Sequence, residues 1–314
     1  MSVITVVIPT FNEELNIYNA YERVKKVFEG SIVDHSFQIL FIDNASTDTT
    51  RDKIRELAAE DSRVQAIFNN TNFGFSKSSF YGLSQAEGDC AVLMYADMQD
   101  PPEVIPQMVK KWEEGYKVVV GVKTKSRENP LMYCIRGIYY RIMDKLSDVE
   151  HIKQFDGFGL YDAGFVKQLR DLKDPLPYLR GVVAELGPER AEIEYTQEAR
   201  KEGKSTFNFM KYYDVAMLGM TSSSRAVLRM ATFLGMILSF ICVVVALVTL
   251  VIKLVYWDYY SVGTAAVLIG IFFVGGVQIF FLGFLGEYIA NINQRTMNHP
   301  IVVEKERINM KREV

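Results

Sequence analysis

Two long stretches without a charged residue constrain this chain more than any other feature of its sequence. Residues 230–252 cover 23 positions and residues 259–286 cover 28, and neither stretch holds an Asp, Glu, Lys or Arg. Each exceeds the ~20 residues with which a helix crosses a bilayer. Buried helices of a water-soluble domain are the competing interpretation. Two such runs in tandem, after a charged region, favour a C-terminal two-helix transmembrane hairpin.

Basic residues flank these two runs unequally. Arg225 and Arg229 precede the first run, and the link between the runs holds only Lys253. The basic residues after the second run are Arg295, Lys305, Arg307, Lys311 and Arg312. The positive-inside rule then predicts that both chain ends lie in the cytoplasm. Residues 206–228 carry apolar side chains at helical spacing, which predicts either an amphipathic helix on the membrane surface or a helix facing the soluble core.

The charged region, residues 1–205, alternates strand and helix patterns. Apolar, β-branched runs predict strands at residues 3–9, 37–42, 64–68, 90–94 and 117–122. Periodic segments predict helices at residues 12–28, 47–60, 76–86 and 104–114. Such alternation is typical of an α/β domain with a mainly parallel sheet and helices on both faces. Ligands of these sheets bind where the strands end in loops at their carboxyl ends.

Several classes of protein are disfavoured. No G-x-G-x-x-G follows the first strand and no P-loop motif is present, which argues against a dinucleotide-binding domain and excludes a P-loop NTPase. The net charge of -3 gives no basis for a nucleic-acid partner. The 3 cysteines and the 3 histidines are scattered, so they predict neither a disulfide framework nor a zinc site.

Polar residues follow three of the predicted strands. They are Glu13 after the first, Asp43 and Asn44 after the second, and Asp97 and Gln99 after the fourth. Carboxylates repel the phosphates of a nucleotide unless a divalent cation lies between them. Asp97 and Gln99 offer oxygen donors two positions apart, which suits Mg²⁺ or Mn²⁺. Taken alone, an Asp-x-Gln is equally compatible with a solvated turn.

Five stretches together resemble a known family. VVIPTFNEE, FIDNASTDTT, NFGFSKSSFYGLSQAEGD, ADMQDPPEVIPQMVKKWEEGYKVVVGV and the paired uncharged runs are similar to the polyprenyl-phosphate glycosyltransferases. These are inverting enzymes of the GT-A Rossmann-like fold, akin to dolichyl-phosphate mannose synthase. The bactoprenol (undecaprenyl-phosphate) hexosyltransferase branch is the more similar one, with its two-span tail ending in a segment like GEYIANINQRTMNHPIVVEKE.

The resemblance implies roles for individual residues. Those expected to bind the nucleotide-sugar are Pro9, Phe11, Glu13, Asp43, Asn44, Ala96, Asp97, Lys123 and Arg127. Asp97 and Gln99 would hold the metal, and Arg200, Lys204 and Ser205 the donor diphosphate or the lipid phosphate, although RKEGK also fits a solvated loop. The catalytic residues would be Asp97 and Asp156, the latter one position out of the family's register. Tyr95 departs from the family, which often has Asp there.

The implied activity is transfer of a hexose, glucose or N-acetylglucosamine, from a UDP-sugar to undecaprenyl phosphate, with inversion. It would act at the cytoplasmic face of the bacterial inner membrane, in building cell-surface glycans. The expected divisions are a catalytic domain (1–205), a juxtamembrane segment (206–229), two spans (230–290) and a cytoplasmic tail (291–314). The resemblance also implies a homotetramer and a flippase partner.

Three alternatives stay open at this point. One is a polyprenyl-phosphate mannosyltransferase that uses GDP-mannose. Another is a processive polysaccharide synthase, although the Q-x-x-R-W motif of that class is absent. The last is a membrane subunit that binds nucleotide-sugars after its catalytic site has decayed, for which Tyr95 and the altered segment around Asp156 are the only support.

Overall fold

The computed structural model describes residues 1–125, 152, 154–172, 174–187, 189–198, 264–297 and 299–310, with Met217 and single positions between 237 and 255. The strands are β1 (Val3–Thr10), β2 (Ser36–Asp43), β3 (Val64–Asn69), β4 (Cys90–Leu93), β5 (Val118–Lys125), β6 (Gly159–Asp162), β7 (Arg190–Thr196) and β8 (Glu304–Ile308). The helices are α1 (Ile17–Ser31), α2 (Thr50–Glu60), α3 (Phe75–Ser84), α4 (Ile105–Glu113), α6 (Ala163–Asp171), α7 (Leu179–Leu186) and α10 (Thr264–Thr296), and a 3-10 turn, η1, covers Pro102–Val104.

The strands form one 8-stranded sheet in the order β7-β5-β6-β4-β1-β2-β3-β8. Strands β4, β1, β2 and β3 are parallel, as predicted from the strand-helix alternation. The prediction of a mainly parallel sheet needs correction on both sides of this centre. Strand β6 runs antiparallel to β4 and β5, and β8 runs antiparallel to β3. The sheet is therefore mixed, because β6 and β8 enter it from segments outside the strand-helix repeat.

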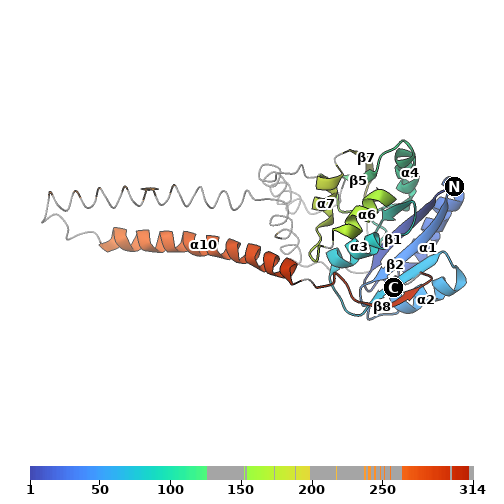
Figure 1. Cartoon of the computed structure of the whole chain (residues 1–314), viewed down its shortest axis with the longest axis horizontal. Helices are drawn as coiled ribbons and strands as arrows, with labels where there is room; N and C mark the ends of the chain where they lie inside the picture. The colour runs from blue at the N-terminus through green and yellow to red at the C-terminus, as the bar shows by residue number, and fades with distance from the viewer. Residues whose placement is uncertain are drawn as a thin grey trace.

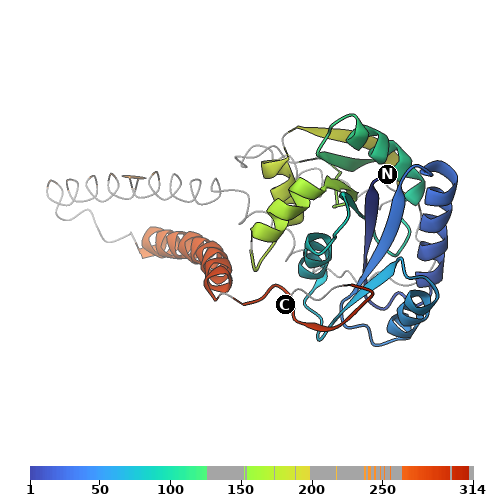
Figure 2. The same cartoon turned by 45° about the vertical axis from the view of Figure 1, so that its right-hand side comes forward.

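Helices cover both faces of the sheet, as Figure 2 shows. Alternate strand residues explain this arrangement, since successive side chains point to opposite faces. Val6 and Phe41 pack in one apolar cluster with α1, α2 and α4, whereas Val7 and Leu40 pack in the other with α3, α6 and α7. Helix α3 lies very close to the sheet, because a Cβ at Gly82 would come within 2.6 Å of Ile42 Cγ2. The α/β architecture predicted from the sequence is confirmed.

Helix α10 extends away from the sheet (Figure 1) and is 33 residues long. It runs to Thr296, six positions beyond the predicted end of the second span. Large apolar side chains that it exposes include Val267, Ile271, Ile279, Leu282, Ile289 and Ile292. Over the part of the chain that the structure describes, no helix is long and apolar enough to cross a membrane. The two-helix hairpin therefore stays a prediction, and most of its first run, like most of residues 206–228, lies outside the described residues.

The chain returns to the sheet after α10. Within the segment that the sequence predicted as a tail, residues 304–308 form β8 and pair with β3 at the edge of the sheet. Glu304 accepts hydrogen bonds from Tyr81 on α3, at 2.8 Å, and from Arg307, at 2.6 Å. Arg55 on α2 forms an ion pair with Glu306, at 2.8 Å. The charged side chains that made this segment look like a solvated tail thus have partners far away in the sequence.

Candidate active site

The loops after β1, β2 and β4 meet at one edge of the sheet. Thr10, the last residue of β1, pairs in register with Asp43, the last residue of β2. On the other side of β1, Leu93 at the end of β4 pairs with Val7. Pro9 lies within β1 beside Ile42. The parallel register thus brings together the polar residues that the sequence placed after these strands.

The loops after β1 and β2 are cross-linked through Asn12. Its backbone N–H donates to Ser46 Oγ at 2.9 Å, and its side-chain oxygen accepts from the N–H of Thr47 at 2.8 Å. Asn12 has a φ of 55°, in the left-handed region that asparagine tolerates better than most residues. The N–H of Glu13 donates to Thr50 Oγ1 at 2.9 Å. Phe11 and Glu13, predicted to hold the base and ribose, therefore belong to a loop that the β2 loop supports.

Asp43 is fully buried and carries an ion pair. Its Oδ2 lies 2.5 Å from Arg51 Nε and also accepts from the N–H of Ser46 at 3.1 Å. Its other oxygen, Oδ1, is buried and has no hydrogen-bond partner within the described structure. A buried acceptor without a partner is costly, so such an atom points to a donor that arrives with a ligand.

Asn44, the neighbour of Asp43, uses its side-chain amide differently. Its oxygen accepts from the N–H of Phe73 at 3.0 Å and from Asn69 Nδ2 at 3.2 Å. Its nitrogen donates to Asn72 Oδ1 at 2.9 Å. The amide thus supports the loop after β3. Within the described structure, Asp43 is the member of the predicted pair whose Oδ1 has no hydrogen-bond partner, whereas Asn44 supports the loop after β3.

The loop after β4 carries the proposed metal ligands. Ala96 is buried, while the side chains of Asp97 and Gln99 are half-buried. The N–H of Gln99 donates to Asp97 Oδ1 at 3.2 Å, and Met98 between them has a φ of 56°. This tight turn keeps both side chains at the end of β4. In the described parts of the chain, no group of three or more His, Cys, Asp or Glu side chains could hold a metal ion.

A mostly buried ion pair lies beside this loop. Lys123 Nζ, on β5, lies 2.5 Å from Asp156 Oδ2 and 3.8 Å from Asp100 Oδ1. Burial favours the neutral form of Lys123, yet the two carboxylates outweigh it and raise the pKa of the lysine. Lys123, predicted to contact the nucleotide-sugar, is thus the partner of Asp156. The structure also brings Asp156 to the same edge of the sheet as Asp97, although Asp156 is one position out of the register of the resembling family.

Asp100 is the most deeply buried carboxyl group of this cluster. Tyr195, on β7, donates a hydrogen bond to its Oδ1 at 2.5 Å. Burial, with a smaller contribution from Asp156, raises the pKa of Asp100 to about 7. Burial and the same two carboxyl groups raise the pKa of Tyr195. The sequence does not reveal that Tyr195 contacts Asp100, because the two residues lie 95 positions apart.

The remaining predicted residues, Arg127, Arg200, Lys204 and Ser205, lie outside the described residues. The chain that leads to the last three is nevertheless anchored at the site. The N–H of Glu198 donates to the carbonyl oxygen of Gln99 at 2.9 Å, and Arg23 pairs with both Glu103 and Glu198. Glu198, the last residue that the structure describes before Arg200, thus lies next to the Asp97 loop.

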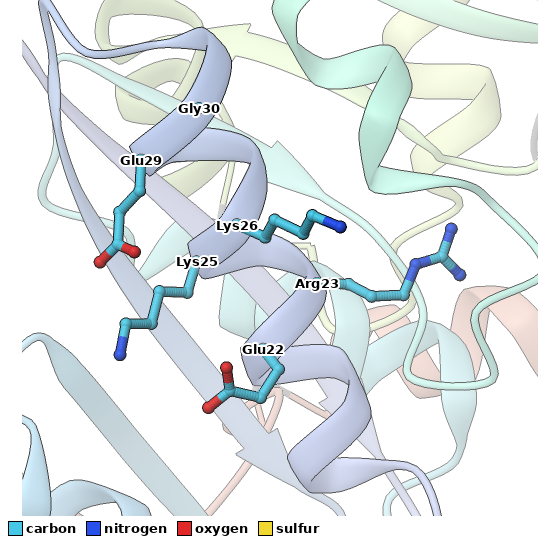
Figure 3. A pocket seen from close by; sticks show the side chains of 6 residues that line it. All are labelled: Glu22, Arg23, Lys25, Lys26, Glu29 and Gly30. Carbon is cyan, nitrogen blue, oxygen red and sulfur yellow. The ribbon is translucent and has the colours of Figure 1, made fainter.

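A surface hollow on α1 is separate from this cluster. Figure 3 shows the side chains that line it, Glu22, Arg23, Lys25, Lys26 and Glu29, with Gly30. They come from one helix and carry mixed charge, and Arg23 and Lys26 extend to one side of this helix while Lys25 extends to the other. None of the predicted site residues lines this hollow.

Acidic loops thus lie at the carboxyl edge of this α/β sheet. Comparison with known proteins identifies the family of the chain. It belongs to the glycosyl transferase family 2, whose model matches residues 5–160. Among its relatives is the SfII prophage-derived bactoprenol glucosyl transferase of Shigella flexneri, 30% identical over 304 residues, which are 96% of this chain and 97% of that protein. The uncharacterized glycosyltransferase YkcC of Bacillus subtilis is 29% identical over 300 residues, 95% of this chain and 92% of that protein.

One solved structure to which this chain is similar is glucosyl-3-phosphoglycerate synthase from Mycobacterium tuberculosis in complex with UDP. It is 18% identical, with a TM-score of 0.49, and the match covers 70% of this chain and 79% of that one.

Proposed function

We propose that this protein transfers a hexose, glucose or N-acetylglucosamine, from a UDP-sugar to undecaprenyl phosphate, with inversion at the anomeric carbon. Similarity to bactoprenol glucosyl transferases over nearly the whole chain supports this substrate pair. The observation that carries the proposal is structural. The Asp97 loop, the buried Asp43 and the Lys123–Asp156 ion pair lie along one edge of the sheet.

On the donor side, Asp43 Oδ1 would accept a hydrogen bond from the uracil ring. That role suits a buried oxygen that has no partner within the described residues. Arg51 compensates the charge of the carboxylate, which makes its burial tolerable. Pro9, Phe11 and Glu13 would contact the base and ribose from the neighbouring loop, with Ala96 and Arg127 nearer the sugar and its phosphates.

Asp97 and Gln99 would hold Mg²⁺ or Mn²⁺. The donor set fits such an ion, because these cations prefer oxygen ligands and are often bound by one or two carboxylates together with substrate phosphates. Two protein oxygens suffice in that arrangement, so a cluster of three acidic side chains is not required. When bound, the metal supplies positive charge beside the diphosphate leaving group.

On the acceptor side, the phosphate of the lipid is already an anion near neutral pH. One of its oxygens forms a bond to the anomeric carbon while the bond from that carbon to the UDP oxygen breaks. Asp156 would orient the acceptor or take a residual proton, and its ion pair with Lys123 holds the carboxylate in place. Arg200, Lys204 and Ser205 would contact the phosphates of the lipid or the donor.

A lipid acceptor requires that the site lie at a membrane. We propose that residues 230–290 form two spans of the bacterial inner membrane, with the catalytic domain (1–205), the juxtamembrane segment (206–229) and the tail (291–314) on the cytoplasmic side. The apolar side chains exposed on α10 support this placement. We further propose that the protein forms a homotetramer and that a flippase partner moves the lipid-linked sugar to the other side of the membrane.

The test is a transfer assay with the full-length protein in membranes. Radiolabelled UDP-glucose, UDP-N-acetylglucosamine and GDP-mannose are each incubated with undecaprenyl phosphate and Mg²⁺ or Mn²⁺. We expect label in the lipid extract, as a single sugar, from one of the UDP-sugars. Label from GDP-mannose alone would contradict a UDP-sugar donor and support a mannosyltransferase. A polymeric product would contradict single-sugar transfer and support a polysaccharide synthase. Nucleotide binding without transfer would support a binding subunit.

A further inference from the structure

Tyr95 connects the Asp97 loop to the turn that carries Asp156 through a hydrogen bond. Its hydroxyl donates a hydrogen bond to the backbone carbonyl oxygen of Asp156, at 2.9 Å, across 61 positions of sequence. The two residues are neighbours because Leu93 at the end of β4 pairs with Gly159 at the start of β6. Tyr95 follows the first of these strands and Asp156 precedes the second.

Gly157 makes this contact possible. Its φ is 121°, a conformation that residues with a side chain rarely adopt. A Cβ at this position would lie 2.6 Å from the hydroxyl oxygen of Tyr95, which is too close for two nonbonded atoms. The hydroxyl therefore occupies the space that a side chain at position 157 would need. A second tyrosine, Tyr161, donates to the carbonyl oxygen of Gly157 at 2.8 Å.

The side chain of Asp156 is held from other directions. Its Oδ1 accepts from the N–H of Phe158 at 3.2 Å, and its Oδ2 lies 2.5 Å from Lys123 Nζ. The ring of Tyr95 also packs against Phe75 at the start of α3, with 5.1 Å between ring centroids. The tyrosine is thus fixed at its ring and bonded at its hydroxyl, and it connects two parts of the site that come from different strands.

We propose that Tyr95 is a positioning residue, which sets the place of the Asp156 carboxylate relative to the Asp97 loop. The inference rests on the proposed function for its catalytic consequence, but not for the contact itself. The proposal gives a role to Tyr95, which stands where the resembling family often has Asp. At position 95 the chain has a tyrosine whose hydroxyl binds the backbone of the neighbouring turn.

The test compares Tyr95→Phe with wild type in the transfer assay and in hydrogen exchange. The substitution removes one hydrogen-bond donor and keeps the ring against Phe75. We expect kcat to fall about tenfold, because a small displacement of an acceptor-side group is enough to slow transfer. The KM for the UDP-sugar should stay within about twofold, since Asp43 and the metal ligands are untouched. Amides of residues 154–160 should exchange faster.

Two further variants sharpen the result. Tyr18→Phe is the matched control, because Tyr18 is a surface tyrosine whose hydroxyl also donates a hydrogen bond, in this case to the side chain of Glu56. It should leave kcat and the exchange of residues 154–160 unchanged. Gly157→Ala should lower kcat in the wild type and lower it less in the Tyr95→Phe background, because the steric conflict involves the hydroxyl.

An unchanged kcat in Tyr95→Phe, or a parallel loss of kcat, donor affinity and thermal stability, would overturn the positioning role. If the wild type transferred no sugar, the proposed function would fail by itself. The exchange measurement would still decide whether the Tyr95 hydroxyl holds the turn, since it needs no substrate.

Discussion

Lys123 and Asp156 form an ion pair in which Nζ and Oδ2 are 2.5 Å apart and both side chains are largely buried. The lysine also lies near Asp100, so it faces two carboxyl groups. Removing one partner of a buried pair leaves an uncompensated charge, which costs more than the pair itself contributes. The pair therefore has consequences for both stability and transfer.

Lys123→Met should lower the transfer rate at least about 100-fold and destabilise the protein by about 2–4 kcal/mol, since the largely buried Asp156 carboxylate would lose its ion-pair partner. The thermal midpoint and kcat of the membrane-embedded protein measure the two effects. Lys117→Met is the control, because its ion pair with Asp162 is 70% exposed on the lysine side and should contribute less than about 1 kcal/mol. Equal effects of the two substitutions would contradict the role of Lys123.

Asp43→Asn should weaken UDP binding about 10- to 100-fold. The substitution removes the charge that Arg51 compensates and, in one amide orientation, replaces the free Oδ1 with a donor. Isothermal titration with UDP measures the affinity, and the thermal midpoint checks that the variant is folded. Asp48→Asn in the same loop is the control, since Asp48 caps backbone N–H groups of Glu14 and Thr50. A folded Asp43→Asn variant with wild-type affinity would rule out the contact with the base.

The docking of β8 predicts that two arginines contribute unequally to stability. Arg307 lies on β8, and Arg55 on α2 pairs with Glu306 of this strand. Arg307 is 10% exposed and bonds to Glu304 and Gln85, whereas the Arg55–Glu306 pair is 39% exposed on both sides. Arg307→Met should therefore destabilise the protein by about 1–3 kcal/mol and Arg55→Met by less than about 1 kcal/mol. Thermal unfolding of the full chain measures both. The reverse order would mean that β8 is not held as described.

Asp61 predicts how stability depends on acid. Hydrogen bonds from the Arg63 side chain are the main cause that lowers the pKa of Asp61 to about 2. A carboxyl group whose pKa is lower in the folded protein stabilises it above its unfolded pKa of ~4, and that contribution is lost as the pH falls from 4 toward 2. Asp61→Asn should thus lower the thermal midpoint at pH 6 and have little effect near pH 2. Asp52→Asn, at an exposed position, should have little effect at either pH.

The sequence predicted the centre of the fold because β1 to β5 are apolar runs separated by periodic segments. It also predicted that Asp43 and Asp97 share an edge, since both follow parallel strands. Strand β8 was not predicted, because its sequence, EKERI, is charged and is stabilised by partners such as Tyr81 and Gln85. Ala191, Ile193 and Tyr195 of β7 alternate as a strand would, and that signal was available.

The site was predictable only where residues follow strands of the repeat. Lys123 is predicted to contact the nucleotide-sugar, and nothing local reveals that Asp156 lies opposite it. Tyr95 was noted as a departure from the family, yet its bond to the Asp156 carbonyl depends on the antiparallel pairing of β4 and β6, which the strand-helix alternation did not suggest. Long-range pairings of this kind are set by tertiary packing and not by local pattern.

The most direct test of the proposed activity is sugar transfer by Asp97→Asn in membranes, with UDP-glucose or UDP-N-acetylglucosamine, undecaprenyl phosphate and saturating Mg²⁺ or Mn²⁺. The substitution keeps the size of the side chain and removes its charge. We expect lipid-linked sugar to form at a rate at least about 100-fold below that of wild type, with normal thermal stability. Transfer at the wild-type rate would contradict a catalytic site built around the Asp97 loop.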